Sequence, residues 1–269
     1  MTPATVPVRS SVVRASDGVG LHVLEAGPDS GAATIVLVPG WTMPAWIWQP
    51  QIDGLAGRFR VLAMDPRGQG ESELPRDGYG IDRRADDIAD VLAAKATSPV
   101  ILVGWSLAAV ETLQCIERHG DARVAGLVLI DSAVGQLPAL PENPEFVKAL
   151  NEDREKAVGG FVKAMFARAQ PEQSLKRLTQ EALRIPLEQS LALFPKHLQR
   201  EHWRGITARF HKPLMYVVTE RLRPQGGNMK RERPATRVEV FEQAGHALFV
   251  DEPERFNALL AEFATAALK

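Results

Sequence analysis

The stretch Val100-Ile-Leu-Val-Gly104-Trp105-Ser106-Leu107-Ala108 decides the fold. An apolar run typical of a strand leads into Gly-x-Ser-x-Ala, and a helical pattern follows at once. On so sharp a strand-to-helix turn the Ser106 hydroxyl is pushed outward, and small residues are needed two positions before and after it. Gly104 and Ala108 meet that need. The stretch predicts a nucleophile at Ser106, close to the N–H groups that begin the next helix.

Short apolar runs alternate with helical patterns, which is typical of a mostly parallel α/β sheet covered on both faces. We expect buried strands at Thr34–Val38, Arg60–Met64, Val100–Val103, Gly126–Ile130, Leu214–Val218 and Arg237–Phe241. Before them, Val12–Ala15 and Leu21–Glu25 flank the turn Ser16-Asp17-Gly18 and predict an antiparallel hairpin. After the last strand, Asp251 and Glu254 have the spacing of an N-terminal helix cap.

The alternation stops between about Ser132 and His211, where helical patterns occur without a strand signal. Phe146–Leu150, Phe161–Ala167 and Leu175–Leu183 are examples. We therefore expect residues 132–211 to form a helical cap, or lid, inserted between two late strands of a core made of 1–131 and 212–269.

A serine in an ordinary turn would give the same local pattern as Ser106. Ser106, however, follows a buried strand midway along the alternating strands and helices, and this position favours its assignment as a nucleophile.

The composition argues against several classes of partner. The 269 residues include 32 Lys and Arg against 33 Asp and Glu, so neither nucleic acid nor an anionic membrane is an expected partner. No apolar run approaches the roughly 20 residues of a membrane helix, and the stretch MTPATVPVRSSVV lacks the apolar region of a secretory signal peptide. We expect a cytoplasmic protein of undetermined oligomeric state. His197 and His202 are five residues apart, on different faces of a helix, and predict no metal site.

The pattern around Ser106 resembles the nucleophile turn of the α/β-hydrolase fold family, and the chain resembles that family over nearly all its length outside the insertion. Pro39-Gly40-Trp41 follows the first parallel strand, where that family usually carries His-Gly before an oxyanion-hole donor. The resemblance assigns the oxyanion hole to the backbone N–H groups of Trp41 and Leu107, and proline in place of histidine leaves these main-chain donors intact. Asp65–Ser72 resembles a structural turn of the family. Ala244-Gly245-His246 resembles its catalytic-histidine loop.

A serine hydroxyl needs a base, and an imidazole base needs a carboxylate to fix its tautomer. The resemblance makes His246 the base. The family usually places the acid after the penultimate strand, but Leu222 occupies that position here. Some members use the end of an earlier strand, which corresponds to Asp131, and Glu220 in the usual loop is the alternative. We favour Asp131, although it could instead cap the first helix of the insertion.

These residues predict a serine hydrolase that cleaves a small, largely apolar carboxylic ester through an acyl-enzyme intermediate. The chemistry requires no metal and no organic cofactor, and the partner is a small-molecule substrate. Apolar side chains near the nucleophile and in the insertion predict the substrate pocket. They are Trp105, Phe161, Met165, Phe166, Phe194 and Trp203.

Two other functions fit the same residues. Pro39-Gly40-Trp41 and the placement of Asp131 also resemble cofactor-independent 2,4-dioxygenases of this fold, which act on hydroxyquinolone-like rings. A non-catalytic receptor for a small ligand is the second alternative. The run Lys230-Arg231-Glu232-Arg233, with Arg221 and Arg223 before it, predicts a solvated basic loop, or else a docking site for an anionic substrate or acyl carrier.

Overall fold

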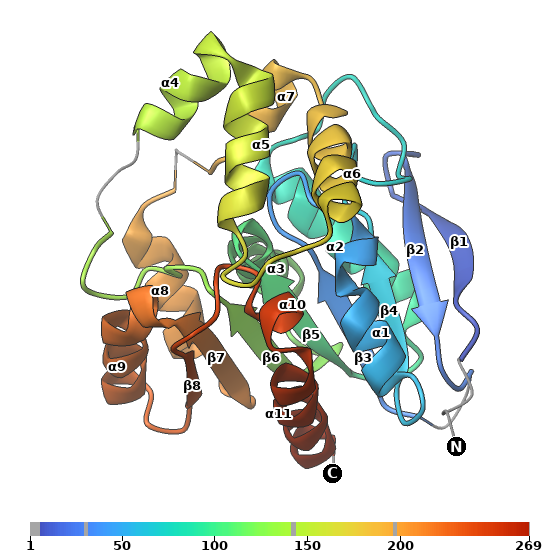
Figure 1. Cartoon of the computed structure of the whole chain (residues 1–269). Coiled ribbons are helices and arrows are strands. Elements are labelled where there is room, and N and C mark those ends of the chain that lie inside the picture. Colours follow the sequence, from blue (N-terminus) through green and yellow to red (C-terminus); the bar gives the residue numbers. More distant parts are fainter. Residues whose placement is uncertain (1–5, 30–31, 141–143, 196–197, 269) are drawn as a thin grey trace.

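An eight-stranded sheet organises the computed structural model, which describes residues 6–29, 32–140, 144–195 and 198–268 (Figure 1). The strands are β1 (Arg9–Arg14), β2 (Gly20–Ala26), β3 (Thr34–Val38), β4 (Arg60–Met64), β5 (Val100–Trp105), β6 (Val124–Ile130), β7 (Leu214–Thr219) and β8 (Arg237–Phe241). Their order is β1-β2-β4-β3-β5-β6-β7-β8. β2 is antiparallel to both β1 and β4, and β3 to β8 run parallel. The predicted fold class, including the N-terminal hairpin, is confirmed.

Helices cover both faces of the sheet. One face carries α1 (Gln49–Leu55) and α11 (Pro253–Ala267), and the other carries α2 (Ile81–Lys95), α3 (Leu107–His119) and α9 (Arg223–Glu232). Short helical segments are η1 (Ala45–Trp48), η2 (Glu220–Leu222) and α10 (Leu248–Asp251). All residues of β3 and β5 are buried, because both faces of these central strands are covered. Within the described ranges, no helix combines the length and the apolar character needed to cross a bilayer.

In the described residues between β6 and β7, the regular elements are all helices, joined by turns and loops. It contains α4 (Pro144–Glu152), α5 (Arg154–Ala164), α6 (Glu172–Leu183), α7 (Leu187–Ala192) and α8 (Arg200–Arg209). Figure 1 shows α4 to α7 gathered above one end of the sheet, whereas α8 contacts α3. Trp41 Nε1 donates to the Ser190 carbonyl at 2.8 Å, and Arg184 donates to the carbonyls of Gly68 and Ser72. These contacts hold α6 and α7 against the loops at that end.

Two local predictions are wrong. Asp251 does not cap α11, whose N-cap residue is Glu252 and has no side-chain cap bond. Asp251 is buried in α10 and accepts backbone hydrogen bonds from other segments instead. The run Lys230–Arg233 is no loop either, because most of it belongs to α9, which contacts β7 and β8.

Candidate active site

The turn at Ser106 has the geometry that an outward-pointing hydroxyl requires. Ser106 joins β5 to α3 with φ 57° and ψ −120°, a backbone conformation that costs energy for a residue other than glycine. A Cβ atom at Gly104 would lie 2.4 Å from the Ala108 carbonyl oxygen, so glycine is required there. The Ser106 N–H donates to the Ile130 carbonyl at 2.8 Å. The strained turn is thus fixed to the end of β6.

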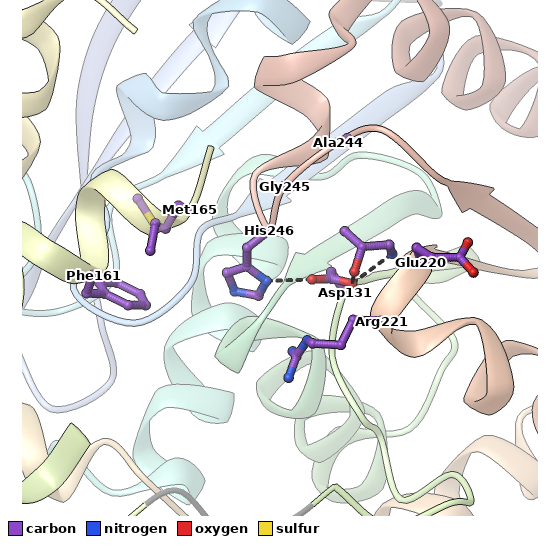
Figure 2. Close-up of a pocket in the computed structure, with 10 residues that line it drawn as sticks. Asp131, Phe161, Met165, Glu220, Arg221, Ala244, Gly245 and His246 are labelled. Atoms are coloured by element: carbon purple, nitrogen blue, oxygen red, sulfur yellow. Dashed lines mark hydrogen bonds and ion pairs between the residues drawn. The ribbon is translucent and has the colours of Figure 1, made fainter. Parts of the chain in front are cut away.

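Three side chains from distant parts of the chain meet beside this turn. Ser106 Oγ lies 2.8 Å from His246 Nε2, and His246 Nδ1 lies 2.7 Å from Asp131 Oδ2. With its proton on Nδ1, His246 donates to Asp131 and accepts from Ser106. Figure 2 shows the imidazole directed at the carboxylate. This is the hydrogen-bonding pattern of a nucleophile, its base and the acid that orients the base.

The Asp131 carboxylate is buried and fully engaged. Its Oδ1 atom accepts two hydrogen bonds of 2.8 Å, from the backbone N–H and the hydroxyl of Thr219. Burial raises the pKa of Asp131, but the hydrogen bond from His246 and those from Thr219 outweigh it and lower the pKa below its ordinary value. Asp131 therefore stays ionised beside His246 over the neutral pH range. Thr219 was not predicted, because no sequence spacing relates it to Asp131.

Glu220, the alternative acid, lies elsewhere. Its exposed carboxylate pairs with Arg223 and extends away from His246 in Figure 2. Leu222, at the position where the family usually carries the acid, is completely buried. Asp131 reaches the imidazole because β6 is the direct neighbour of β5 in the sheet, so the two strands end side by side.

The loop that carries His246 is fixed by two side chains. Trp105 Nε1 donates to the His246 carbonyl at 2.9 Å. The Asp251 carboxylate accepts from the N–H groups of Gly245 and Ala167 at 2.8 Å each, and from that of Arg168 at 3.1 Å. Asp251 thereby ties the histidine loop to the segment after α5. Sequence reasoning assigned Asp251 to a helix cap and missed this role.

The loop Pro39-Gly40-Trp41 lies directly against Ser106. A Cβ atom at Gly40 would lie 3.0 Å from the Ser106 Cβ atom. Leu107 is the first residue of α3, so its N–H has no acceptor within the helix. In the described part of the chain, neither the Trp41 nor the Leu107 N–H donates a hydrogen bond. Both donors are therefore available beside the serine.

A buried chain of polar groups supports this loop. Gln69 Nε2 donates to the carbonyls of Gly40 at 3.1 Å and Met43 at 2.7 Å. Gln69 Oε1 accepts from Arg84 at 3.2 Å, and both Glu111 carboxylate oxygens accept from Arg84. Since Glu111 belongs to α3, these hydrogen bonds connect the Gly40 loop to the helix that follows Ser106. No sequence pattern predicted it.

A cavity of about 470 Å³ adjoins His246. Its lining combines apolar side chains with the loops after β6, β7 and β8 (Figure 2). The lining residues are Asp131, Phe161, Ala164, Met165, Thr219, Glu220, Arg221, Ala244, Gly245 and His246. Ser106 is not one of them. The residue is partly exposed, however, and its hydroxyl is hydrogen-bonded to His246, which does line the cavity.

Only part of the predicted substrate pocket lines this cavity. Phe161 and Met165 do. Trp105 is almost completely buried beneath His246, and Phe194 stacks on Trp41 with ring centres 5.7 Å apart. Two further residues lie outside the lining as well. Phe166 follows α5, with its backbone against Gly245, and Trp203 belongs to α8, which contacts α3. The sequence pattern identified these side chains as apolar, but not which of them face the cavity.

The described residues offer neither a candidate metal site nor a reactive thiol. No group of three or more His, Cys, Asp or Glu side chains there could hold a metal ion, and His197 lies outside the described ranges. Cys115 is buried, and this burial raises the pKa of its thiol to about 12. Because only the thiolate is a strong nucleophile, Cys115 is inert at neutral pH.

Comparisons with known proteins agree with this fold. The model of the alpha/beta hydrolase family matches residues 35–259. A pimeloyl-[acyl-carrier protein] methyl ester esterase of Vibrio atlanticus is 30% identical and covers 93% of this chain and 99% of its own. An AB hydrolase superfamily protein of Bacillus subtilis is 26% identical over 86% of this chain and 91% of its own. The crystal structure of a candidate aryl esterase of Burkholderia cenocepacia superposes with a TM-score of 0.85, at 25% identity, covering 97% of this chain and 99% of that one.

Proposed function

The chain belongs to the α/β-hydrolase family, and we propose that it is a serine hydrolase that cleaves carboxylic esters through an acyl-enzyme intermediate. The observation that carries the proposal is the hydrogen-bonded series Ser106–His246–Asp131, with distances of 2.8 and 2.7 Å. The names of two relatives, a methyl ester esterase and a candidate aryl esterase, support an ester as substrate. A nucleophile, its base and an orienting acid are what acyl transfer needs.

The first half of the reaction acylates Ser106. His246 Nε2 accepts the hydroxyl proton while Ser106 Oγ attacks the carbonyl carbon of the ester. The carbonyl oxygen becomes an oxyanion, which accepts hydrogen bonds from the N–H groups of Trp41 and Leu107. When the intermediate collapses, the bond to the alcohol oxygen breaks and His246 transfers its proton to the departing alcohol. Asp131 stabilises the imidazolium and keeps Nε2 directed at the reacting atoms.

The second half releases the acid. Water loses a proton to His246 Nε2 and attacks the acyl carbon, and the same two N–H groups hold the second oxyanion. The bond to Ser106 Oγ then breaks, and the serine regains its proton from His246. We assign residues 132–211 to a cap over this site, with Phe161 and Met165 providing an apolar wall for the acyl or alcohol group.

Hydrolysis of p-nitrophenyl esters of increasing chain length tests the proposal. Ser106→Ala and His246→Gln are expected to lower kcat by about 10³-fold or more, since each removes a reacting group. Ser10→Ala is a matched control. Ser10 Oγ lies 2.7 Å from His22 Nε2, and His22 Nδ1 lies 2.7 Å from Asp65 Oδ2, but none of the three lines the cavity.

The control variant is expected to keep the activity of the wild type. The proposed function would be contradicted if the wild-type protein hydrolysed none of these esters. So would activity that survives the loss of both Ser106 and His246.

A further inference from the structure

We propose that Arg221 binds an anionic group of the substrate, so that the ester carries a carboxylate or a similar anion at a distance from the bond that is cleaved. This inference rests on the proposed function and narrows its substrate class. Arg221 lines the cavity together with His246. Within the described residues, its guanidinium group takes part in no hydrogen bond and no ion pair.

Most of the neighbouring charges differ from Arg221 because they are already engaged, and Arg231, which has no partner among the described residues either, does not line the cavity. Glu220 accepts from Arg223, and Arg223 also pairs with Glu242. Further along, Glu232 pairs with Arg204, and Arg233 donates to backbone carbonyls. Of the basic residues that suggested a docking site for an anion, Arg221 is the one that lines the cavity.

The orientation of Arg221 suits a ligand in the cavity. In Figure 2, the Arg221 guanidinium extends toward the side where His246 and Phe161 lie, whereas the Glu220 carboxylate extends the other way. The third charged group of the lining, Asp131, is occupied by His246 and Thr219. Arg221 is therefore a cation without a counterion among the described residues, positioned beside the reacting histidine. Its planar donor fork matches a carboxylate or phosphate in a two-bond contact.

The other lining residues are largely apolar, and they indicate that the anionic group lies at one end of the substrate. Phe161, Ala164, Met165 and Ala244 give the cavity apolar surface. A substrate that fits both features has an apolar segment against these side chains and an anionic group at Arg221. Since Arg221 is exposed, water weakens the contact, and we expect an effect of about five- to tenfold rather than more.

Two pairs of esters that differ in one charge test the inference. For the acyl side, mono-p-nitrophenyl glutarate is compared with p-nitrophenyl methyl glutarate. For the alcohol side, m-carboxyphenyl butyrate is compared with its methyl ester, with hydrolysis followed by pH-stat. The quantity measured is the ratio of kcat/KM for the anionic ester to kcat/KM for the neutral one. Each pair is measured with the wild type, Arg221→Gln, Arg221→Glu and Arg231→Gln.

Arg231 is a matched control because it is an exposed arginine of the same basic run that does not line the cavity. We expect Arg221→Gln to lower the ratio about five- to tenfold in at least one pair, Arg221→Glu to lower it further, and Arg231→Gln to leave it unchanged. The wild-type ratio is also expected to fall as salt is added.

An unchanged ratio in both pairs for Arg221→Gln would overturn the inference while leaving the proposed function intact, provided that the neutral esters are hydrolysed. An equal loss with the anionic and neutral esters would also overturn it, because Arg221 would then act on the reaction or the fold rather than on the anion. If the wild type hydrolyses none of the four esters, the proposed function fails and the inference fails with it.

Discussion

The side-chain amide of Gln69 holds the peptide that joins Gly40 to Trp41, with Nε2 lying 3.1 Å from the Gly40 carbonyl oxygen. A peptide unit is planar, so fixing its oxygen also fixes the direction of the Trp41 N–H on the opposite side of the same unit. The amide cannot reverse without losing the hydrogen bond that its Oε1 atom accepts from Arg84. A residue outside the loop therefore orients one of the two expected oxyanion donors.

Gln69→Met tests this positioning role. Methionine keeps the approximate length of the side chain but cannot donate to the loop. We expect kcat for a neutral p-nitrophenyl ester to fall about tenfold with little change in KM, because an oxyanion donor acts in the transition state rather than in substrate binding. Steady-state kinetics of the purified variant provide both constants.

Gln51→Met is the matched control for that experiment. Gln51 is also completely buried, and its Nε2 atom donates to the Phe249 carbonyl in α10 rather than to the loop that carries Gly40. It should lose stability in urea unfolding without the selective loss of kcat. A rise in KM at constant kcat in Gln69→Met would contradict the proposed role.

Asp131→Asn and Glu220→Gln separate the two candidate acids. The first is expected to lower kcat by about 10²- to 10⁴-fold, because an amide cannot hold the required tautomer of His246 or stabilise its cation. The second removes a charge that pairs with Arg223 on the exposed surface, and its effect should be small. Circular dichroism confirms that both variants are folded. The assignment of Asp131 is wrong if the larger loss occurs in Glu220→Gln.

Asp251→Asn tests the anchor of the histidine loop. An amide has one acceptor oxygen where the carboxylate has two, so one or more of the N–H groups of Gly245, Ala167 and Arg168 lose their partner. We expect a loss of about 1–3 kcal/mol in the free energy of unfolding, together with a lower kcat. Glu254→Gln, on the exposed start of α11, should change neither. Equal stability of the two variants would contradict the role given to Asp251.

We expect the environment of His22 to make the stability of the fold depend on pH, independently of catalysis. Its ring lies between Asp65 and Ser10, with Glu71 nearby, and the hydrogen bond to Asp65 raises the pKa of His22 above its ordinary value of 6.5. A raised pKa stabilises the folded protein fully below the unfolded pKa, and this stabilisation is lost as the pH rises through the folded pKa. The difference in unfolding free energy between the wild type and His22→Gln should therefore be larger at about pH 6 than at about pH 9.

Urea unfolding at both pH values measures this difference. His202→Gln serves as the control, because His202 is hydrogen-bonded to the amide of Gln114 and, among the residues that the structure describes, to no carboxylate. If the difference in unfolding free energy between the wild type and His22→Gln stays constant or grows toward pH 9, the pair of His22 and Asp65 does not stabilise the fold as described.

The features that could be predicted from sequence are those that local patterns determine. Thr34–Val38 and Arg60–Met64 were predicted at their observed bounds, because buried parallel strands appear as short continuous apolar runs. The pattern around Ser106 likewise depends on adjacent residues. The acid could be narrowed to Asp131 and Glu220, but the choice depends on β5 and β6 being neighbours, which one sequence does not state.

The features that were missed depend on contacts between distant residues. Gln69 acts on a loop 29 positions away, and no periodicity marks such a pair. The basic run Lys230–Arg233 was expected to be a loop, but most of it belongs to α9. α9 also contains Gly226 and Gly227, and each glycine lowers helix propensity by about 1 kcal/mol. A Cβ atom at Gly226 would lie 2.9 Å from a methyl carbon of Val238, so close contact with β8 requires glycine there despite its low propensity. Tertiary packing decided that element.

Mass spectrometry of the protein quenched during turnover of p-nitrophenyl butyrate tests the central claim most directly. The account predicts one butyryl group per chain, located by proteolysis on the peptide that contains Ser106, and absent from Ser106→Ala. Turnover without a covalent acyl group, or an acyl group on Ser10 rather than Ser106, would contradict it.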